Sequence, residues 1–441
     1  VLLFLSCSNT NQGELVGTRK KSRVFHHSEP YGMVFVPMGS YTMGVGGVDI
    51  KYSNTAQPKT VSVSAFYMDE TEITNNEYRE FVYWVRDSIA RCVLADAGVE
   101  GFKKLSKEGD EILYEGADAS KDYILDWNTE INWQSEDETV KQALDENLFL
   151  RVEERYKGKK GIDSRKLIYE YYWIDLKDAA RKEFNDGNYD YLNAGLSNRP
   201  QGMQDRSVYI KHDQINVYPD TLAWIHDYSY AYNEPLTEKY FWHVAYDDYP
   251  VVGVNWNQAR AFCVWRTEKL NSYLRTQKGN PELSEFRLPT EAEWEWAARG
   301  GNLNNPYPWG GPYARTAQGC FLANFKPLRG NYIADGGLRT LVVGAYRPNG
   351  WGLYDMAGNV AEWTNSAYDP ISYSYAWDMN PNYTYNAHPN DPPVMKRKVI
   401  RGGSWKDIAH YLEVSTRAYE YQDTAKCYIG FRCIQPYLGH Y

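Results

Sequence analysis

The sequence lacks the marks of a membrane-spanning or nucleic-acid-binding chain. None of its apolar runs approaches the ~20 residues that a helix needs to cross a bilayer. Its 57 Asp and Glu outnumber its 48 Lys and Arg, and it has no basic stripe of the kind that binds nucleic acid. Phosphate-binding loops, nucleophile elbows and paired catalytic carboxylates are also missing. These absences favour an acidic protein with no nucleic-acid partner.

Histidine and cysteine are scarce, with eight and six residues in 441. No histidine pair has the helical spacing, together with a carboxylate, that a histidine metal site requires. Cys7 follows the apolar stretch Val1–Leu5, as in the end of a bacterial lipoprotein signal peptide. We therefore expect Cys7 to be lipidated, and a truncated ordinary signal peptide or a vector residue is the alternative. The five other cysteines leave at least one unpaired.

Tyrosine and tryptophan are abundant, at 39 and 15 residues against 14 Phe. Both side chains bury a large body but need a polar partner, so they suit half-wet surfaces and interfaces. The 24% of charged and 43% of hydrophobic residues are typical of a globular protein. The length allows one large domain with an insertion, or two domains.

One short helix has both of its ends specified by the sequence. Thr290 is a natural N-cap, Glu293 is placed to complete a capping box, and Gly300 can end the helix in a left-handed conformation. Glu295 and Arg299 have the favourable i,i+4 order. A helix this short is marginal alone, so we expect tertiary burial of one face to hold it.

The three glutamates of this helix, Glu291, Glu293 and Glu295, are interpreted as capping and solvent-facing charges rather than as acid/base groups. Elsewhere the patterns predict a hairpin over Met33–Met43 and a buried strand over Pro250–Trp256.

A longer amphipathic helix is predicted after a second capping box, Thr74 with Glu77. Tyr78, Phe81 and Val85 follow it at helical spacing, which indicates a buried face.

Four motifs occur in order along the chain. They are MVFVP…GSYTMG at 33–44, FRLPTEAEWEWAARGG at 286–301, GWGLYDMAGNVAEW at 350–363, and RGGSW at 401–405 with GFRC at 430–433. Together they resemble the formylglycine-generating-enzyme family of sulfatase-modifying factors. The resemblance implies a loop-rich α+β fold related to C-type lectins.

The family pattern divides the chain into four parts. Residues 1–30 hold the signal-peptide remnant, the lipidated Cys and a tether. Residues 31–90 and 248–441 form the sulfatase-modifying-factor domain. Residues 91–247 are a Tyr-rich insertion, which we interpret as an extension of the domain that serves as a docking surface.

The resemblance also defines where catalysis would occur. Formylglycine-generating enzymes carry two thiols after the Arg-Gly-Gly-Ser motif, which hold copper because soft ligands bind Cu(I). Asp407 and Leu412 occupy those two positions here. A carboxylate and a hydrocarbon cannot hold Cu(I), and the histidine spacing that an iron site requires is missing. We therefore expect no enzyme activity and neither copper nor iron.

Two further features are implied by the family. One is a disulfide between Cys263 and Cys433, which would fit an oxidising compartment. The other is calcium bound by side-chain and carbonyl oxygens in loops, with turn-stabilising Asn and Asp residues as the alternative interpretation. The matching positions are Asn324, Phe325, Asp335 and Gly337 for one site, and Asn359, Val360 and Glu362 for a second.

A narrower resemblance covers the tether, the first helix and the exit from the insertion. Gly13–Gly17, Pro30–Met33, Phe66–Asn75, Trp84–Arg91 and Tyr246–Gly253 are similar to the GldK/PorK type of gliding-motility and type IX secretion lipoproteins. The GldJ type shares several of these stretches. The resemblance implies a lipid-anchored, periplasm-facing protein of the outer membrane. It also implies self-association in a ring with a GldN/PorN-type partner, beside other secretion components.

Within the insertion we expect Tyr171, Tyr172 and Trp173 to contact a partner. Two other classes of function stay open. One is a metal-dependent oxidase of the formylglycine-generating or sulfoxide-synthase type, and the other is a cell-wall glycan-binding module with aromatic platforms.

Overall fold

The computed structural model describes most of the chain outside its first residues and several connections. The described residues are 28–44, 57–105, 123–175, 209–227, 236, 239–277, 282–327, 331, 333 and 337–439. The expected lipidation site, Cys7, and the predicted ligand Asp335 lie outside them. No helix among the described residues is long and apolar enough to span a membrane.

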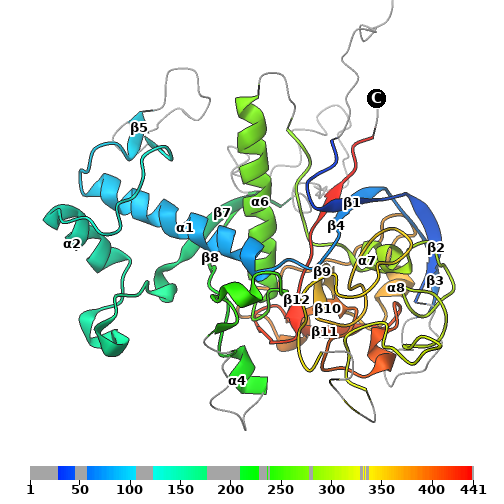
Figure 1. Cartoon of the computed structure of the whole chain (residues 1–441). Coiled ribbons are helices and arrows are strands. Elements are labelled where there is room, and N and C mark those ends of the chain that lie inside the picture. Colours follow the sequence, from blue (N-terminus) through cyan, green and yellow to red (C-terminus); the bar gives the residue numbers. More distant parts are fainter. Residues whose placement is uncertain are drawn as a thin grey trace, which may run out of the picture.

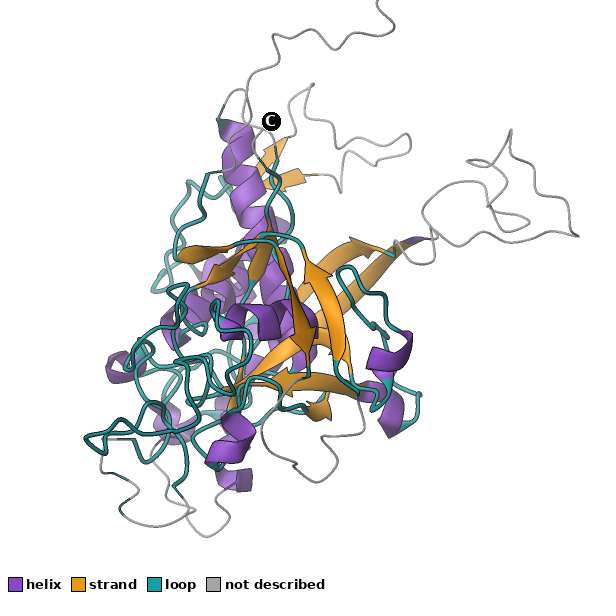
Figure 2. Cartoon of the chain, turned by 90° about the vertical axis from the view of Figure 1, so that its right-hand side faces the viewer, coloured by secondary structure: helices purple, strands orange, loops and turns teal. Residues whose placement is uncertain are grey.

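The described part contains mixed helices and strands joined by many loops (Figures 1 and 2). The α-helices are α1 (Asn75–Asp96), α2 (Glu138–Asn147), α4 (Ala223–Asp227), α6 (Trp256–Thr276), α7 (Glu291–Arg299) and α8 (Ser372–Tyr375). The strands are β1 (Met33–Val36), β2 (Gly39–Met43), β3 (Lys59–Val63), β4 (Phe66–Asp69), β5 (Lys103–Leu105), β6 (Tyr123–Leu125), β7 (Ile168–Ile174), β8 (Ile210–Asn216), β9 (Ala361–Ala367), β10 (Arg397–Arg401), β11 (Ala418–Tyr421), β12 (Ile429–Gly430) and β13 (Ile434–Pro436). The 3-10 helices are η2 (Val152–Glu154), η3 (Tyr156–Gly158), η4 (Ser164–Lys166), η6 (Val244–Tyr246), η7 (Pro393–Lys396) and η8 (Ala409–Leu412).

The strands form several small sheets. One sheet has the order β11-β10-β9-β12, in which β12 runs parallel to β9, and another has the order β1-β4-β13. Three two-stranded ribbons pair β2 with β3, β5 with β6, and β7 with β8. In Figure 1 the four-stranded sheet and α7 lie on the right, while α1, α2 and the β7–β8 ribbon extend to the left across α6.

The predicted caps of α7 are confirmed. The Thr290 hydroxyl accepts a hydrogen bond from the Glu293 amide, and the Glu293 carboxylate accepts one from the Thr290 amide. Gly300 ends the helix at φ 52°, in the left-handed region that suits glycine. Every residue of α7 is buried, so packing on all sides stabilises this nine-residue helix.

Two predicted elements are wrong. Met33–Met43 is not a hairpin, because β1 pairs with β4 and β2 pairs with β3. Pro250–Trp256 is buried but contains no regular strand, and α6 already begins at Trp256. In both cases the apolar pattern reports burial correctly, but it does not specify the partner.

The helix predicted after Thr74 is confirmed as α1. Its capping box with Glu77 forms, and the side chains of Tyr78, Phe81 and Val85 are buried. Phe81 contacts both Tyr169 of β7 and Phe262 of α6 edge to face, with ring centroids 5.3 and 5.9 Å apart. The apolar core of the sulfatase-modifying-factor part therefore continues into the predicted insertion.

Candidate functional site

The turn that follows β10 (Arg397–Arg401) contains Asp407, one of the two positions that the resemblance predicts for the family's catalytic thiols. Gly402 and Gly403 carry the chain away from the strand with φ of 89° and 66°. A Cβ at Gly403 would lie 2.8 Å from the carbonyl oxygen of Tyr411, so the close approach requires glycine. The two predicted positions, Asp407 and Leu412, lie within this turn and η8.

Asp407 stabilises this turn through its side chain. Its Oδ2 accepts hydrogen bonds from the Ser404 amide at 3.0 Å and from the Ser404 hydroxyl at 2.6 Å. Burial raises the pKa of Asp407 above its ordinary value, and the bonds from Ser404 oppose the shift. This arrangement is an ordinary polar cap of a turn and contains no soft ligand.

Leu412 is fully buried. Its side chain belongs to a small apolar cluster with Tyr307, Ala323, Phe325 and Ala357. A hydrocarbon in such a cluster contributes to packing but cannot coordinate a metal or transfer a proton.

An open, mostly apolar cavity of about 350 Å³ lies beside this cluster, with Arg315, Phe321, Phe325 and Ala409 in its wall. The guanidinium of Arg315 stacks over the Phe321 ring at 4.1 Å. The cavity contains no paired acid and base among its lining residues.

The predicted cysteine pair is brought together. The sulfur atoms of Cys263 on α6 and Cys433 are 3.3 Å apart, both side chains are buried, and both are thiols in this structure. Burial raises the pKa of Cys433 well above its ordinary value, and the neighbouring Cys263 adds to the shift. The disulfide between them stays a prediction.

The first predicted calcium set converges in part. Asn324 donates from Nδ2 to the Asn359 Oδ1 at 3.3 Å and to the Arg339 carbonyl at 2.6 Å. Gly337 lies so close that a Cβ there would be 2.6 Å from the Asn324 Oδ1. Amide and carbonyl oxygens are ligands that calcium accepts, and Asn324, Phe325 and Gly337 would hold the ion.

The second predicted set is already engaged. Glu362 is fully buried, and its carboxylate accepts hydrogen bonds of 2.6 to 2.9 Å from Arg432 and of 2.7 Å from the Trp294 indole. The Val360 amide and the Asn359 side-chain amide both donate to the carboxylate of Glu72. A cation at this set would have to share Glu362 with the guanidinium of Arg432.

Sequence reasoning missed two carboxylates next to this set. Burial raises the pKa of Glu72 well above its ordinary value, and Asp355 and Glu362 add to the shift. Burial raises the pKa of Asp355 itself to about 6. Asp355 is part of the GWGLYDMAGNVAEW motif, and this membership was the sequence feature that could have marked it as a site residue. The described residues contain no group of three or more His, Cys, Asp or Glu side chains placed to hold a metal ion.

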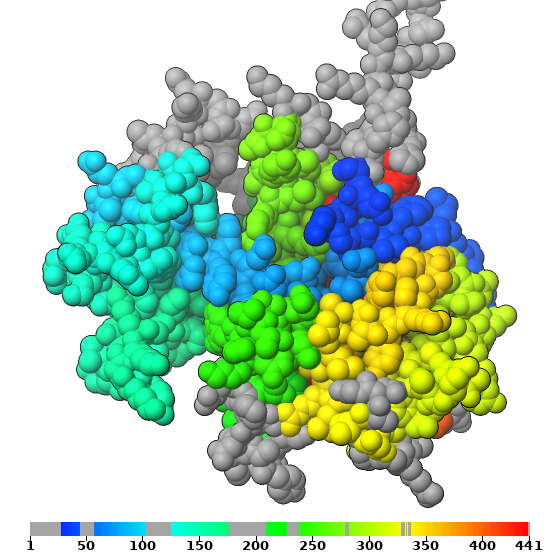
Figure 3. Space-filling view, in the orientation of Figure 1, coloured from blue at the N-terminus to red at the C-terminus, as the bar shows by residue number. Residues whose placement is uncertain are grey.

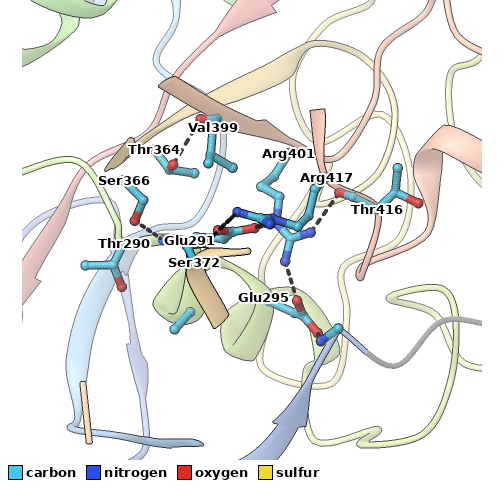
Figure 4. A network of polar contacts seen from close by, with 12 residues as sticks. Thr290, Glu291, Glu295, Thr364, Ser366, Ser372, Val399, Arg401, Thr416 and Arg417 are labelled. Carbon is cyan, nitrogen blue, oxygen red and sulfur yellow. Dashed lines mark hydrogen bonds and ion pairs between the residues drawn. The ribbon is translucent and has the colours of Figure 1, made fainter. Parts of the chain in front are cut away.

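The interpretation of the α7 glutamates as solvent-facing charges is wrong, because all three are buried. Glu295 accepts bonds from Arg299 at 2.6 Å, from Arg401 and from the Gly44 amide at 3.0 Å. Figure 4 shows the Arg401 side chain reaching both Glu295 and the backbone of Thr416.

Glu291 is held in the same way. It binds Arg417 through two bonds of 2.6 and 3.0 Å (Figure 4). It accepts a third bond from the Tyr373 hydroxyl. Burial opposes ionisation, but Arg417 and Arg401 keep the pKa of Glu291 below its ordinary value. The carboxylate therefore stays charged near neutral pH and has a structural role.

The predicted partner contacts separate into buried and exposed residues. Tyr171 faces the core and is only 3% exposed, so it is not an accessible contact. Tyr172 points the other way, is 64% exposed and stacks on His212 of β8 at 4.7 Å. Trp173 is half-buried beneath the Arg260 guanidinium.

Tyr172 belongs to the exposed face of the β7–β8 ribbon, which carries apolar side chains and also Glu170, His212 and Gln214. Ile168, Ile174 and Ile210 share this face by strand alternation, and all are exposed. Among the described strands, β7 and β8 pair only with each other. We call Tyr172 and the three isoleucines the ribbon face.

A second exposed surface lies beyond α8. Trp377 and Met379 are 85% and 73% exposed, the former being the most exposed tryptophan of the described chain. Asp378 and Asn380, between and after them, bind the backbone of Ser62 on β3 through two bonds of 2.8 Å. The backbone is therefore fixed while the apolar side chains stay in contact with solvent. We call Trp377 and Met379 the loop surface.

Comparison with known proteins supports the motif-based interpretation. Residues 20–148 and 209–436 match the family model described as the sulfatase-modifying factor enzyme 1-like domain. The formylglycine-generating enzyme of Bos taurus is 26% identical over 421 residues, which covers 93% of this chain and 76% of that protein. The inactive C-alpha-formylglycine-generating enzyme 2 of Bos taurus is 35% identical over 192 residues. That match covers 42% of this chain and 50% of that protein, so the chain spans half of its length.

Solved structures also resemble the chain. The structure of PvdO from Pseudomonas aeruginosa aligns with a TM-score of 0.45 at 17% identity, covering 94% of this chain and 98% of that one.

Proposed function

The chain belongs to the sulfatase-modifying factor enzyme 1-like domain family, and from this premise we propose that it is a non-catalytic, structural member. In this proposal it is a lipoprotein of the type IX secretion and gliding-motility machinery, anchored through Cys7 and facing the periplasm at the outer membrane. It assembles into a ring with a GldN/PorN-type partner. The fold serves as a framework whose loops present contact surfaces.

The observation that carries the proposal is the pair Asp407 and Leu412. The two positions that would hold copper contain a carboxylate engaged by Ser404 and a leucine packed in an apolar cluster. Neither group is a soft ligand of the kind that holds Cu(I). That one relative is named an inactive enzyme supports the idea that this fold can persist without the activity.

The two exposed apolar surfaces support assembly. The ribbon face belongs to β7 and β8 at the left of Figure 1, and the loop surface follows α8 at the right. Two different surfaces on separate sides of one molecule suit heterologous contacts, which form a ring when the rotation between neighbouring copies closes. Exposed Trp and Tyr side chains are typical of residues that dominate binding free energy.

The test compares the full chain with the double variant D407C/L412C. We expect the wild-type protein to bind Cu(I) no more tightly than exposed thiols do, and to consume no oxygen with a thiol peptide. The double variant should gain Cu(I) affinity, because two thiolates then occupy the turn. Copper-dependent turnover by the wild-type protein would overturn the proposal and favour the oxidase alternative.

Assembly is tested separately by native mass spectrometry or electron microscopy of the purified protein with its partner. A chain that remains monomeric under all conditions contradicts the structural role. The exposed Trp377 also favours a second candidate, a glycan-binding module, because an exposed indole can stack on a sugar ring. Pull-down with isolated cell wall, lost in Trp377→Ala, would support that candidate.

Calcium is part of the proposal as a loop-stabilising ion at Asn324, Phe325 and Gly337. Because an ion that binds only the folded state stabilises it, excess calcium should raise the melting temperature and chelation should lower it. An unchanged melting temperature would remove calcium from the proposal.

A further inference from the structure

An apolar groove lies between the beginning of α1 and the second half of α6. Its volume is about 590 Å³. The floor and walls consist mainly of apolar side chains from α6 and the residues that follow it, namely Phe262, Trp265, Leu270, Leu274, Leu283 and Phe286. A groove of this composition favours an apolar occupant.

The charged residues at the groove are largely paired with each other. The guanidinium of Arg266 binds the carboxylate of Asp69 at 2.8 Å, and Lys269 approaches Glu80 at 3.3 Å. Glu77 caps α1. No lone buried charge therefore calls for a small ionic ligand. The α1 side of the groove carries the carboxylates of Glu77 and Glu80, and Lys269 on the α6 side is the partner of Glu80.

The first described residues of the chain line the same groove. Residues 28–31 form part of its wall, and the backbone is then fixed where the Glu70 amide binds the Gly32 carbonyl at 3.0 Å. Figure 3 shows the dark-blue N-terminal segment of the described chain beside the light-green part that contains α6. The 27 residues that precede Ser28 therefore enter the described structure at the groove.

The preceding sequence contains a matching apolar pair. Val24 and Phe25 lie four and three residues before Ser28. An extended chain spans at most ~3.3–3.6 Å per residue, so the backbone between this pair and Ser28 can span at most about 14 Å. The basic run Arg19–Arg23 comes just before them and complements the carboxylates of Glu77 and Glu80.

We propose that Val24 and Phe25 occupy this groove in the same molecule and so fasten the tether to the domain. The apolar pair covers the aromatic and aliphatic side chains of α6, and the basic run lies over the acidic start of α1. Docking of this pair shortens the length of chain that links Cys7 to the domain. This proposal goes beyond the proposed function and holds whether or not the chain joins a ring.

Photo-crosslinking in the full chain tests the proposal. Phe25 is replaced by benzoylphenylalanine, the protein is irradiated, and the products are mapped by mass spectrometry. We expect intramolecular crosslinks to Leu270, Leu274 or Phe286. The matched probe at Val16 should give at least fivefold less of these products, and Leu270→Glu should reduce the Phe25 crosslinks by a similar factor.

Tryptic cleavage after Arg23 gives an independent measurement. We expect the V24A/F25A variant to be cut at least fivefold faster than the wild type, while H26A/H27A is cut at the wild-type rate. Far-UV circular dichroism verifies that each variant is folded. Crosslinks to a second copy or to a partner, crosslinks that avoid the groove, or unchanged cleavage of V24A/F25A would each overturn the proposal.

Discussion

The α7 region and the β7–β8 ribbon use similar residue types in opposite ways. In α7 every residue is buried, and the carboxylates of Glu291 and Glu295 bind arginines from distant parts of the chain. In the ribbon, alternate residues are buried and exposed, so Tyr171 packs in the core while Tyr172 faces solvent. The first region specifies the fold, and the second leaves apolar surface available for another molecule.

The comparison predicts that the two regions respond to mutation differently. A buried charge whose partner is removed remains desolvated and uncompensated, which is costly. Truncating an exposed aromatic residue changes the unfolding free energy of the free protein only slightly. The truncation lowers the binding free energy when that side chain contacts a partner.

The largest expected effect is that of Glu295→Ala. The substitution removes the carboxylate that binds both Arg299 and Arg401, and both guanidiniums are fully buried. Breaking a buried pair in this way costs about 3–5 kcal/mol of unfolding free energy. Urea denaturation measures the change. The control Glu282→Ala, which disrupts an exposed ion pair with Arg275, should cost less than ~0.5 kcal/mol. Equal decreases in the unfolding free energy of Glu295→Ala and Glu282→Ala would contradict the conclusion that the buried ion pairs of α7 specify the fold.

Lys398 sharpens the comparison, because it is a buried cation in β10 whose ammonium contacts a carbonyl oxygen and an aromatic ring. Its ammonium donates to the Tyr385 carbonyl at 2.6 Å and lies 3.8 Å from the centre of the Trp256 ring. Burial, with the nearby Arg260, lowers the pKa of Lys398 to about 7. The folded state therefore binds fewer protons than the unfolded state between pH 7 and the ordinary lysine pKa of about 10.4.

Since the unfolded state holds the extra proton, Lys398 makes stability rise with pH through that window. The slope is about 1.4 kcal/mol per pH unit, or roughly 2 kcal/mol between pH 7.5 and pH 9. Urea denaturation across this range should show the rise in the wild type and in the control Lys396→Met, and its loss in Lys398→Met. Parallel pH profiles for the wild type and Lys398→Met would show that the ammonium is not desolvated as described.

How much the sequence could predict depends on whether an element is specified locally. The caps of α1 and α7 involve residues three positions apart, so sequence reasoning finds them. The burial of Glu291 and Glu295 is decided by Arg417 and Arg401, which lie 126 and 106 residues further along the chain. No local pattern reports such a partner, and the glutamates were therefore misjudged as solvent-facing.

The candidate site shows the same division. The positions of Asp407 and Leu412 follow from a short motif, and the sequence shows that neither side chain is a thiol. The sequence does not predict which residues surround them, because Leu412 packs against Tyr307 and Phe325 from an irregular segment. The strand predicted as one arm of a hairpin, β1, likewise pairs with β4 because the tertiary fold selects the partner.

A smaller effect on stability is expected for Thr290→Ala. The hydroxyl accepts the Glu293 amide at 3.1 Å, and loss of such a cap costs about 1 kcal/mol. Thr139→Ala, on the exposed first turn of α2, is the matched control and should change the unfolding free energy by less than ~0.5 kcal/mol. A cap variant as stable as the control would mean that packing alone holds α7.

The smallest effect on stability, and the sharpest test of the ribbon, is expected for Tyr172→Ala. Because this side chain is 64% exposed, its loss should change the unfolding free energy by less than about 0.5 kcal/mol. Tyr171→Ala should lower the unfolding free energy by about 3–5 kcal/mol, as truncations of buried aromatic side chains do. A double variant of Tyr171 and Tyr172 could therefore lose its partner simply because it unfolds. Partner retention in a pull-down should fall at least tenfold for Tyr172→Ala. Full retention by this folded variant would remove the ribbon face as a contact surface and leave the loop surface at Trp377 as the remaining candidate.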